Sequence, residues 1–421
     1  MSRGRPVGGN RGGKGGRGVS MEPRSLSESE GGGGVALYAY NTTRTMKAML
    51  MTSLEVNDRS VADLLSTNVS SNADFSLDVV FTTLPFELEQ ACRSAVIVAL
   101  SKGCVYSGCG NVLKLNGIPG AAPVVYFCMV RDLSPPKDKQ KIADGEEGVG
   151  DAAAAALDTS YYASDHVVCF VAEPLKQNDE LELFRPELDA FCGQLARDGV
   201  LGAFDPSSIR SRQMLMSWRA RTMEYLSWCI TSIGDRTADV VQAALLGQDI
   251  EVVGGTADQA GDIQRFCIDV SPRSLLHYPA DSLRPLLSGE GAAYIAPPPK
   301  AILTLDDSGI LVSADGLART TSNFCKQWAE AMVSAAMDTT AVKMILQNNG
   351  RKVIQEVNRI KWLLGMAESN HYALYNARRY LTKCGTPPRA LLQHVVDTIE
   401  AGSSAHALDV VTVLIQAQLL L

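Results

Sequence analysis

The sequence predicts an α+β protein with a disordered N-terminal arm, a mixed α/β body and a mostly helical C-terminal quarter. Three observations carry this prediction. Glycine makes up eight of the first 18 residues, short β-branched runs alternate with helical patterns over residues 35–320, and helical periodicity dominates from Thr321 to Leu421. The 421 residues are 46% hydrophobic, which is enough for a large core, and no apolar run approaches the roughly 20 residues that span a bilayer.

Residues 1–34 are expected to form the disordered arm, because glycine loses the most backbone entropy on ordering and buries nothing. The whole chain has a net charge of −7, yet its first 20 residues carry +5, which leaves −12 for the remainder. A basic tail on an acidic body is typical of a segment that contacts a polyanion. The cations of the arm are Arg3, Arg5, Arg11, Lys14 and Arg17.

The body, residues 35–320, begins with a strand at 78–84, a helix at 85–103 and a strand at 122–130. Pro85 starts the helix and acidic residues fill its first turns, which suits a helix N-terminus. The segment 131–160 combines Pro135-Pro136, many charges and an alanine tract, so it is predicted to be a long exposed loop.

A further strand is predicted at 166–174, a helix at 206–233 with Asp205 as its N-cap, and a hairpin at 300–316 around Asp307-Ser308-Gly309. The helical region 321–421 is expected to be interrupted at Gly350, Gly365, residues 385–388 and Gly402. Its apolar tail, ALDVVTVLIQAQLLL, must be covered by the chain's own body or by another subunit.

No catalytic residue, metal site or cofactor is predicted. The five histidines form no H-E-x-x-H motif, and no G-x-S-x-G turn is present. Gly8-x4-Gly13-Lys14 lacks the preceding strand and the Ser or Thr of a phosphate-binding loop, and Cys104 and Cys109 have no second cysteine pair at zinc-ligand spacing. The scattered cysteines indicate reduced, mostly buried thiols in a cytosolic or nuclear protein.

Nucleic-acid binding is the predicted chemistry. Besides the arm, the 206–233 helix carries Arg212 and Arg219 at nearly one azimuth. Residues 343–383 carry a net +6 with interleaved aromatics, a pattern in which cations contact phosphates and rings stack on bases. The candidate contacts in this last cluster are Arg351, Lys352, Arg359, Lys361, Arg378, Arg379 and Lys383, and the aromatics are Trp362, Tyr372, Tyr375 and Tyr380.

Each of these features also has a structural interpretation. The arm suits a solubilising tail, the 206–233 arginines suit the solvated face of an amphipathic helix, and single aromatics at helical spacing suit a core.

The arm MSRGRPVGGNRGGKGGRG, with the size and layout of the chain, resembles the coat and nucleocapsid proteins of RNA viruses. That resemblance implies a structural protein that packages single-stranded RNA through sequence-tolerant backbone contacts, assembles as a homo-oligomer without membrane insertion, and occurs in the virion and the host cytoplasm. Two alternatives stay open: a cellular RNA-binding protein with an Arg/Gly tail, and an enzyme whose site is dispersed through residues 35–320.

Overall fold

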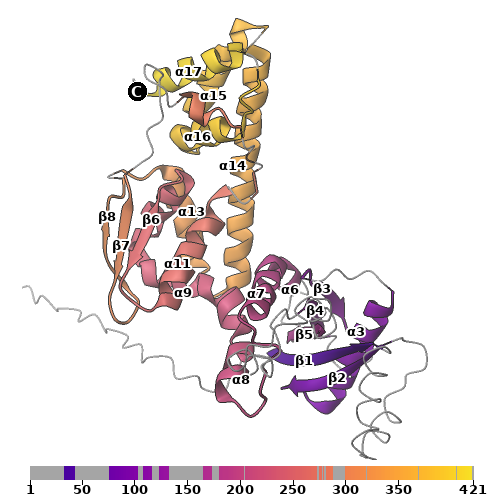
Figure 1. Ribbon diagram of the computed structural model, residues 1–421. Coiled ribbons are helices and arrows are strands. Elements are labelled where there is room, and N and C mark those ends of the chain that lie inside the picture. The colour runs from indigo at the N-terminus through magenta and orange to yellow at the C-terminus, as the bar shows by residue number, and fades with distance from the viewer. Residues whose placement is uncertain are drawn as a thin grey trace, which may run out of the picture. The chain divides into compact units, whose positions relative to one another are not determined.

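A five-stranded antiparallel sheet is the first folded element of the computed structural model, and its strand order is β2-β1-β5-β4-β3 (Figure 1). The strands are β1 (Gly33–Thr42), β2 (Phe75–Thr82), β3 (Asn111–Lys114), β4 (Val124–Arg131) and β5 (Asp165–Ala172). The structure describes residues 33–42, 75–102, 108–115, 123–131, 165–172, 180–202, 204–272, 275–276, 278, 281–287, 299–318, 320–367, 369–403 and 405–419.

Helices cover both faces of this sheet. Alternate residues of a strand point to opposite faces, so Val168 and Phe170 of β5 pack with α6 (Glu180–Leu183) and α7 (Arg185–Arg197). Cys169 between them packs with α3 (Phe86–Ser101) on the other face. Burial on both sides explains why β4 and β5 are continuous hydrophobic runs rather than alternating ones. The predicted strands and the helix after Pro85 are confirmed.

The prediction of one continuous helix over 206–233 is wrong. The segment contains α8 (Ile209–Met216), a π-helical turn η3 (Ala220–Glu224) and α9 (Tyr225–Ile233). Ser217 and Thr222 donate from their hydroxyls to backbone carbonyl oxygens of Met214 and Trp218, both at 2.8 Å, and such local bonds compete with the helical ladder.

The cap of that segment also differs from the prediction. Ser208 is the N-cap of α8, with its hydroxyl accepting from the Ser211 backbone N–H at 3.5 Å. Asp205 instead accepts from the Ser207 backbone N–H at 2.8 Å in a tight turn outside the helix.

A second, three-stranded sheet has the order β6-β7-β8 and includes the predicted hairpin. β7 pairs with β6 in parallel and with β8 antiparallel. Asp306 closes the hairpin turn, because its carboxylate accepts from the backbone N–H groups of Ser308 and Ile310, both at 2.9 Å. These strands are β6 (Ile250–Val253), β7 (Ala301–Leu305) and β8 (Leu311–Asp315).

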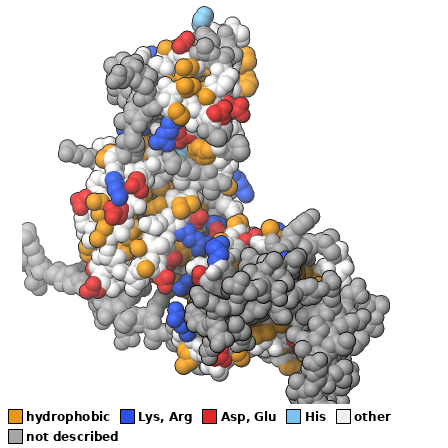
Figure 2. Space-filling view, viewed as in Figure 1, with side chains coloured by type: hydrophobic (Ala, Val, Ile, Leu, Met, Phe, Trp, Pro, Cys, Tyr) orange, Lys and Arg blue, Asp and Glu red, His pale blue; other side chains and the backbone are white. Residues whose placement is uncertain are grey.

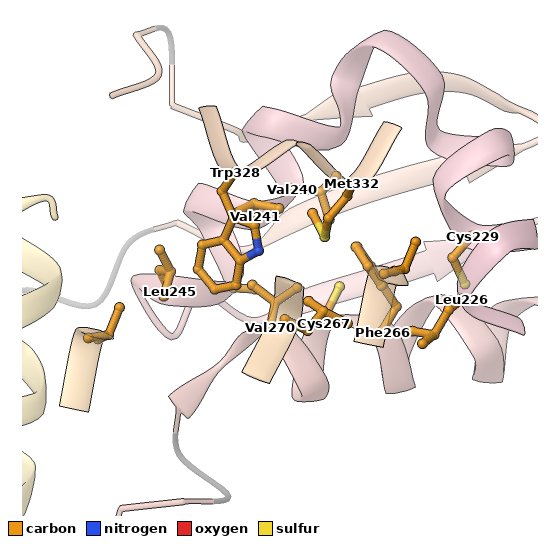
Figure 3. Close-up of a cluster of buried hydrophobic side chains, with 14 of the residues drawn as sticks. Leu226, Cys229, Val240, Val241, Leu245, Phe266, Cys267, Val270, Trp328 and Met332 are labelled. Atoms are coloured by element: carbon orange, nitrogen blue, oxygen red, sulfur yellow. The ribbon is translucent and has the colours of Figure 1, made fainter. Parts of the chain in front are cut away.

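Figure 3 shows the core beside this sheet, where Trp328 and Met332 of α13 meet Val240 and Val241 of α10 and Phe266 of α11. All five side chains are buried. This part of the chain contains η4 (Gly234–Arg236), α10 (Thr237–Leu245), α11 (Ala257–Val270), α12 (Arg284–Leu287) and α13 (Asn323–Ser334).

The C-terminal region is helical, and its longest element is α14 (Thr339–Ala367). The expected interruptions at Gly350 and Gly365 are wrong, since α14 runs through both. Buried Val353, Val357 and Ile360 anchor one face of the helix, and that packing outweighs the low helix propensity of glycine. The following helices are α15 (His371–Lys383), α16 (Pro388–Thr398) and α17 (Ala405–Leu419), so the breaks expected at 385–388 and Gly402 are confirmed.

The apolar tail packs within its own chain as far as its side chains are described. Val411, Leu414 and Ile415 of α17 are buried, and α17 contacts α14 and α16. Among the described helices, none is long and apolar enough to cross a membrane. The predicted arm apart from Gly33 and Gly34, which begin β1, and the predicted loop apart from Arg131, which ends β4, lie outside the described residues.

Candidate functional site

A surface groove of about 480 Å³ lies between α14 and α15, and exposed aromatic and cationic side chains meet there. Only residues 368–370 separate the two helices in sequence, and the helices pack together as a hairpin. Residues equally far from the hairpin turn therefore lie opposite one another. The lining residues are Arg359, Trp362, Leu363, Met366, Asn370, Ala373, Asn376, Arg379, Tyr380 and Lys383.

Asn370 both starts α15 and lines the groove. Its backbone is extended, and its side-chain oxygen accepts from the Tyr372 backbone N–H at 2.9 Å. An asparagine N-cap satisfies one of the free N–H groups at a helix start. At the other end, Gly385 and Pro387 follow Lys383 and stop α15. The local sequence thus fixes where α15, which forms one side of the groove, begins and ends.

The groove has an apolar floor and a partly apolar rim. Leu363 and Ala373 are buried at its base, whereas Trp362 is 53% exposed and Met366 is 41% exposed. Exposed apolar side chains that gather in one groove mark a contact site more than isolated ones do, and Trp and Met are enriched in the cores of protein interfaces.

Three cationic side chains line the groove beside its apolar floor, and they come from both helices. Arg359 comes from α14, while Arg379 and Lys383 come from α15, one turn apart. All three side chains are exposed. Within the described part of the chain, no carboxylate lies within ion-pair distance of them, and none of the lining residues is acidic. The groove therefore offers positive charge that an incoming anion would neutralise.

Arg359 is held by the ring of Trp362. Its guanidinium carbon lies 4.4 Å from the centre of that ring, which is the geometry of a cation–π contact. Because α14 places the two residues three positions apart, on neighbouring turns of one face, the contact is local. It orients the guanidinium over the groove and covers one face of the tryptophan.

A buried carboxylate of α14 lies close to Tyr380 and Cys384. Glu356 is buried in α14, and its Oε2 has no hydrogen-bond partner among the described residues. Burial and the Glu356 charge raise the pKa of the Tyr380 hydroxyl, and they raise the pKa of the Cys384 thiol to about 12. Tyr380 therefore keeps its proton and can act as a hydrogen-bond donor in the groove.

The structure brings three of the sequence-predicted cations together, namely Arg359, Arg379 and Lys383. Arg351 and Lys352 are exposed earlier on α14, outside the groove lining, and the Lys352 ammonium lies 4.9 Å from the centre of the Phe324 ring.

The remaining cations of that cluster also lie outside the lining. Arg378 is exposed on α15 next to Arg379, and Lys361 is half-buried, which lowers the pKa of its ammonium. Tyr372 and Tyr375 stack on α15 with ring centres 5.8 Å apart and are exposed, but they do not line the groove.

The two predicted cations of residues 206–233 are half-buried, and one of them forms ion pairs inside the fold. Arg219 is half-buried and pairs with Glu180 at 3.0 Å and Glu224 at 3.6 Å. Arg212 is half-buried on α8. On the face drawn in Figure 2, the Lys and Arg side chains lie in separate places, several of them beside Asp or Glu, and form no continuous band. The arm cations Arg3, Arg5, Arg11, Lys14 and Arg17 lie outside the described residues.

Sequence reasoning missed the apolar and amide members of the groove, which are Leu363, Met366, Asn370, Ala373 and Asn376. The signal was present as helical spacing, because 359, 363 and 366 share one face of α14 and 373, 376 and 380 share one face of α15. What the sequence did not disclose is that these two faces border the same groove.

A comparison with known families decides the identity of the chain. The family model described as the Njmu-R1-like protein family matches residues 35–417. The chain belongs to the Njmu-R1-like family. It is 27% identical over 330 residues to Protein Njmu-R1 of Mus musculus, and the match covers 76% of each chain.

Membership of the Njmu-R1-like family corrects the viral interpretation. The relative is a mouse cellular protein, so the predicted identity as a coat or nucleocapsid protein and the predicted location in a virion are wrong. The misleading feature was the Arg/Gly composition of residues 1–34, and these residues lie outside the family match. Of the interpretations left open by the sequence, a cellular protein is favoured.

Proposed function

We propose that this member of the Njmu-R1-like family is a cellular binding protein and that its α14–α15 groove holds an acidic segment of another protein. One observation carries the proposal: exposed Trp362 and Met366 lie beside three cations that have no carboxylate partner in the described chain. Trp, Met and Arg are the residue types enriched at the centres of protein interfaces. No catalytic step is part of the proposal.

The floor of the groove favours a protein over a nucleic acid. Leu363, Met366 and Ala373 offer apolar contact area that a phosphodiester backbone does not use. Arg359 already covers one face of Trp362, which leaves that face closed to a stacked base. In addition, the chain beyond its first 20 residues carries −12, and a negative field repels a long polyanion more than a short acidic segment.

RNA binding stays a prediction. The arm cations that are expected to contact RNA lie outside the described residues. Single-stranded RNA binding by the full chain and by Arg359→Glu is therefore measured beside the experiment below.

The experiment is a selection from an unbiased peptide library on the full chain, followed by affinity measurements on the selected peptides. We expect peptides that combine Asp or Glu with large apolar residues. Trp362→Ala should weaken their binding by about 30-fold, as expected for a residue worth about 2 kcal/mol at an interface centre. Arg359→Glu should weaken it by at least about tenfold, since it replaces attraction by repulsion.

Matched controls come from exposed residues elsewhere. Phe86→Ala removes an exposed ring on α3, and Arg210→Glu reverses an exposed arginine on α8; neither should change the affinity. Selected peptides that bind every variant equally would place their site elsewhere. Failure to select acidic peptides, together with single-stranded RNA binding that Arg359→Glu abolishes, would replace a protein partner by a nucleic acid.

A further inference from the structure

We infer that the segment held in the groove is an amphipathic α-helix of about three turns whose acidic residues are concentrated at one end. The inference rests on the proposed function and specifies the partner's shape and charge pattern. It follows from the length of the groove, from the backbone of its two walls and from the uneven placement of its cations.

The length of the groove matches a short helix. Along α15 the lining runs from Asn370 to Lys383, which spans about 20 Å at 1.5 Å per residue. Along α14 it runs from Arg359 to Met366, about 10 Å. A helix of about 12 residues is 18 Å long and fills this range.

The walls favour a helical occupant because they offer no free backbone edge. Both are α-helices whose internal backbone N–H and C=O groups are paired within the helix, so an extended peptide could not add as a strand. An extended peptide over Leu363 and Ala373 would leave its own backbone groups unpaired against an apolar floor, which is costly. A helix satisfies those groups internally.

The lining residues also recur at helical intervals. Positions 359, 363 and 366 form one row on α14, and positions 373, 376, 380 and 383 form one row on α15. Two such rows leave a groove between them into which the side chains of a third helix can insert. Ala373 has the smallest side chain of the lining and permits the closest approach.

The cations occupy one end of the groove. Arg359 lies ten residues before the centre of the hairpin turn and Arg379 ten residues after it, so the two are opposite one another, and Lys383 is one turn further on. Next to the turn the groove is formed by Met366, Asn370 and Ala373. A complementary helix therefore has Asp or Glu on both sides of its apolar seam at one end and apolar residues at the other.

Three synthetic peptides of about 12 residues, which contain the same residues apart from the staple, test this inference. The first peptide is stapled as a helix and has its acidic residues at one end. The second is also stapled, but its acidic residues are distributed evenly. The third has its acidic residues at one end, is not stapled, and has its proline moved to the centre so that it cannot form a helix. Binding of the full chain to each is measured by fluorescence anisotropy. We expect the first peptide to bind at least about tenfold more tightly than either of the others.

A charge exchange locates the contact. Arg359→Glu/Arg379→Glu should lose at least about tenfold affinity for the first peptide and regain it for the same helix with lysines in place of its acids. Lys326→Glu, an exposed lysine on α13, is the matched control and should change neither affinity.

The outcomes separate this inference from the function on which it rests. If the proline peptide binds as tightly as the stapled one, the partner is not a helix, although an acidic segment still binds. If evenly distributed acids bind equally well, the charge pattern is wrong. If no acidic peptide binds in any form, the proposed function fails too. Self-association that Trp362→Ala abolishes would make the occupant a second copy of this chain.

Discussion

At the scale of single residues, Lys343 and Glu187 form an ion pair that is buried inside the fold. Both side chains are more than nine-tenths buried, and they connect α14 to α7. The Lys343 ammonium also lies 5.9 Å from the centre of the Phe184 ring. Its charge, which the sequence placed in a basic excess over 343–383, is neutralised inside the protein.

Lys343→Met should destabilise the protein by about 3–5 kcal/mol, because it leaves the Glu187 carboxylate buried and without its cation. Urea denaturation measures the change. Arg185→Met is the matched control: it removes an exposed pair with Glu182, whose side chains are 38% and 55% exposed, and should cost less than about 1 kcal/mol. Replacing Lys343 by Met and Glu187 by Leu together should restore much of the stability; equal losses in Lys343→Met and Arg185→Met would contradict the prediction.

At the scale of elements, local signals located most helices and strands but not their continuity. Pro85 and the acids after it placed α3, and the β-rich runs placed β2, β4, β5 and the β7–β8 hairpin. The prediction for 206–233 failed because the backbone changes register at a π-helical turn, where the Tyr225 N–H bonds to the Ala220 carbonyl oxygen five residues earlier. The sequence does not reveal where such a turn occurs.

In α14 the sequence predicted a break at a glycine where the helix in fact continues. Gly365 continues the helix because its neighbours pack, so the residue is tolerated rather than required. It is exposed, and no atom outside the local backbone lies within 4 Å of the position that a Cβ would take.

Gly365→Ala should therefore stabilise the protein by about 0.8–1 kcal/mol, the difference between the helix propensities of the two residues. Thermal unfolding followed by circular dichroism measures it as a higher Tm. Gly254→Ala is the opposing control: Gly254 has φ +83°, and an added Cβ would lie 2.3 Å from the Leu305 carbonyl oxygen. A lower Tm for Gly365→Ala would show that α14 needs flexibility at this position.

At the scale of the whole molecule, most of the described thiols are buried in the core. Of the nine cysteines that the structure describes, all are free and seven are buried. Burial, reinforced by the charge of Asp269, raises the pKa of Cys267 to about 12, and burial raises the pKa of Cys325 to about 11. In the unfolded chain both thiols ionise with a pKa of about 8.5.

Stability should consequently fall as the pH rises above about 8.5. Between that pH and about 11 to 12, the native state retains thiol protons that the unfolded state releases, which favours unfolding. Each thiol contributes up to about 1.4 kcal/mol per pH unit. Urea denaturation at pH 8.0 to 9.5 tests this, and Cys267→Ala/Cys325→Ala should flatten the dependence; an unchanged slope in that variant would remove these thiols as the cause.

The candidate site was predictable only in part at this scale. The sequence located Arg359, Arg379 and Lys383 in a basic and aromatic segment, and the structure places all three around one groove. It did not separate them from Arg219 and Lys343, because ion pairs with Glu180 and Glu187 join residues far apart in the chain. Long-range pairing, rather than local composition, decides which cations stay available to a partner.

The 29 residues of α14 extend over about 43 Å without a break in their hydrogen-bonded backbone. Its first turns contain Lys343, anchored in the interior, and its last turns bear one side of the groove. Because one unbroken helix carries both the buried Lys343 and the groove residues Arg359 to Met366, a partner that binds the groove contacts the same element that pairs with Glu187 of α7.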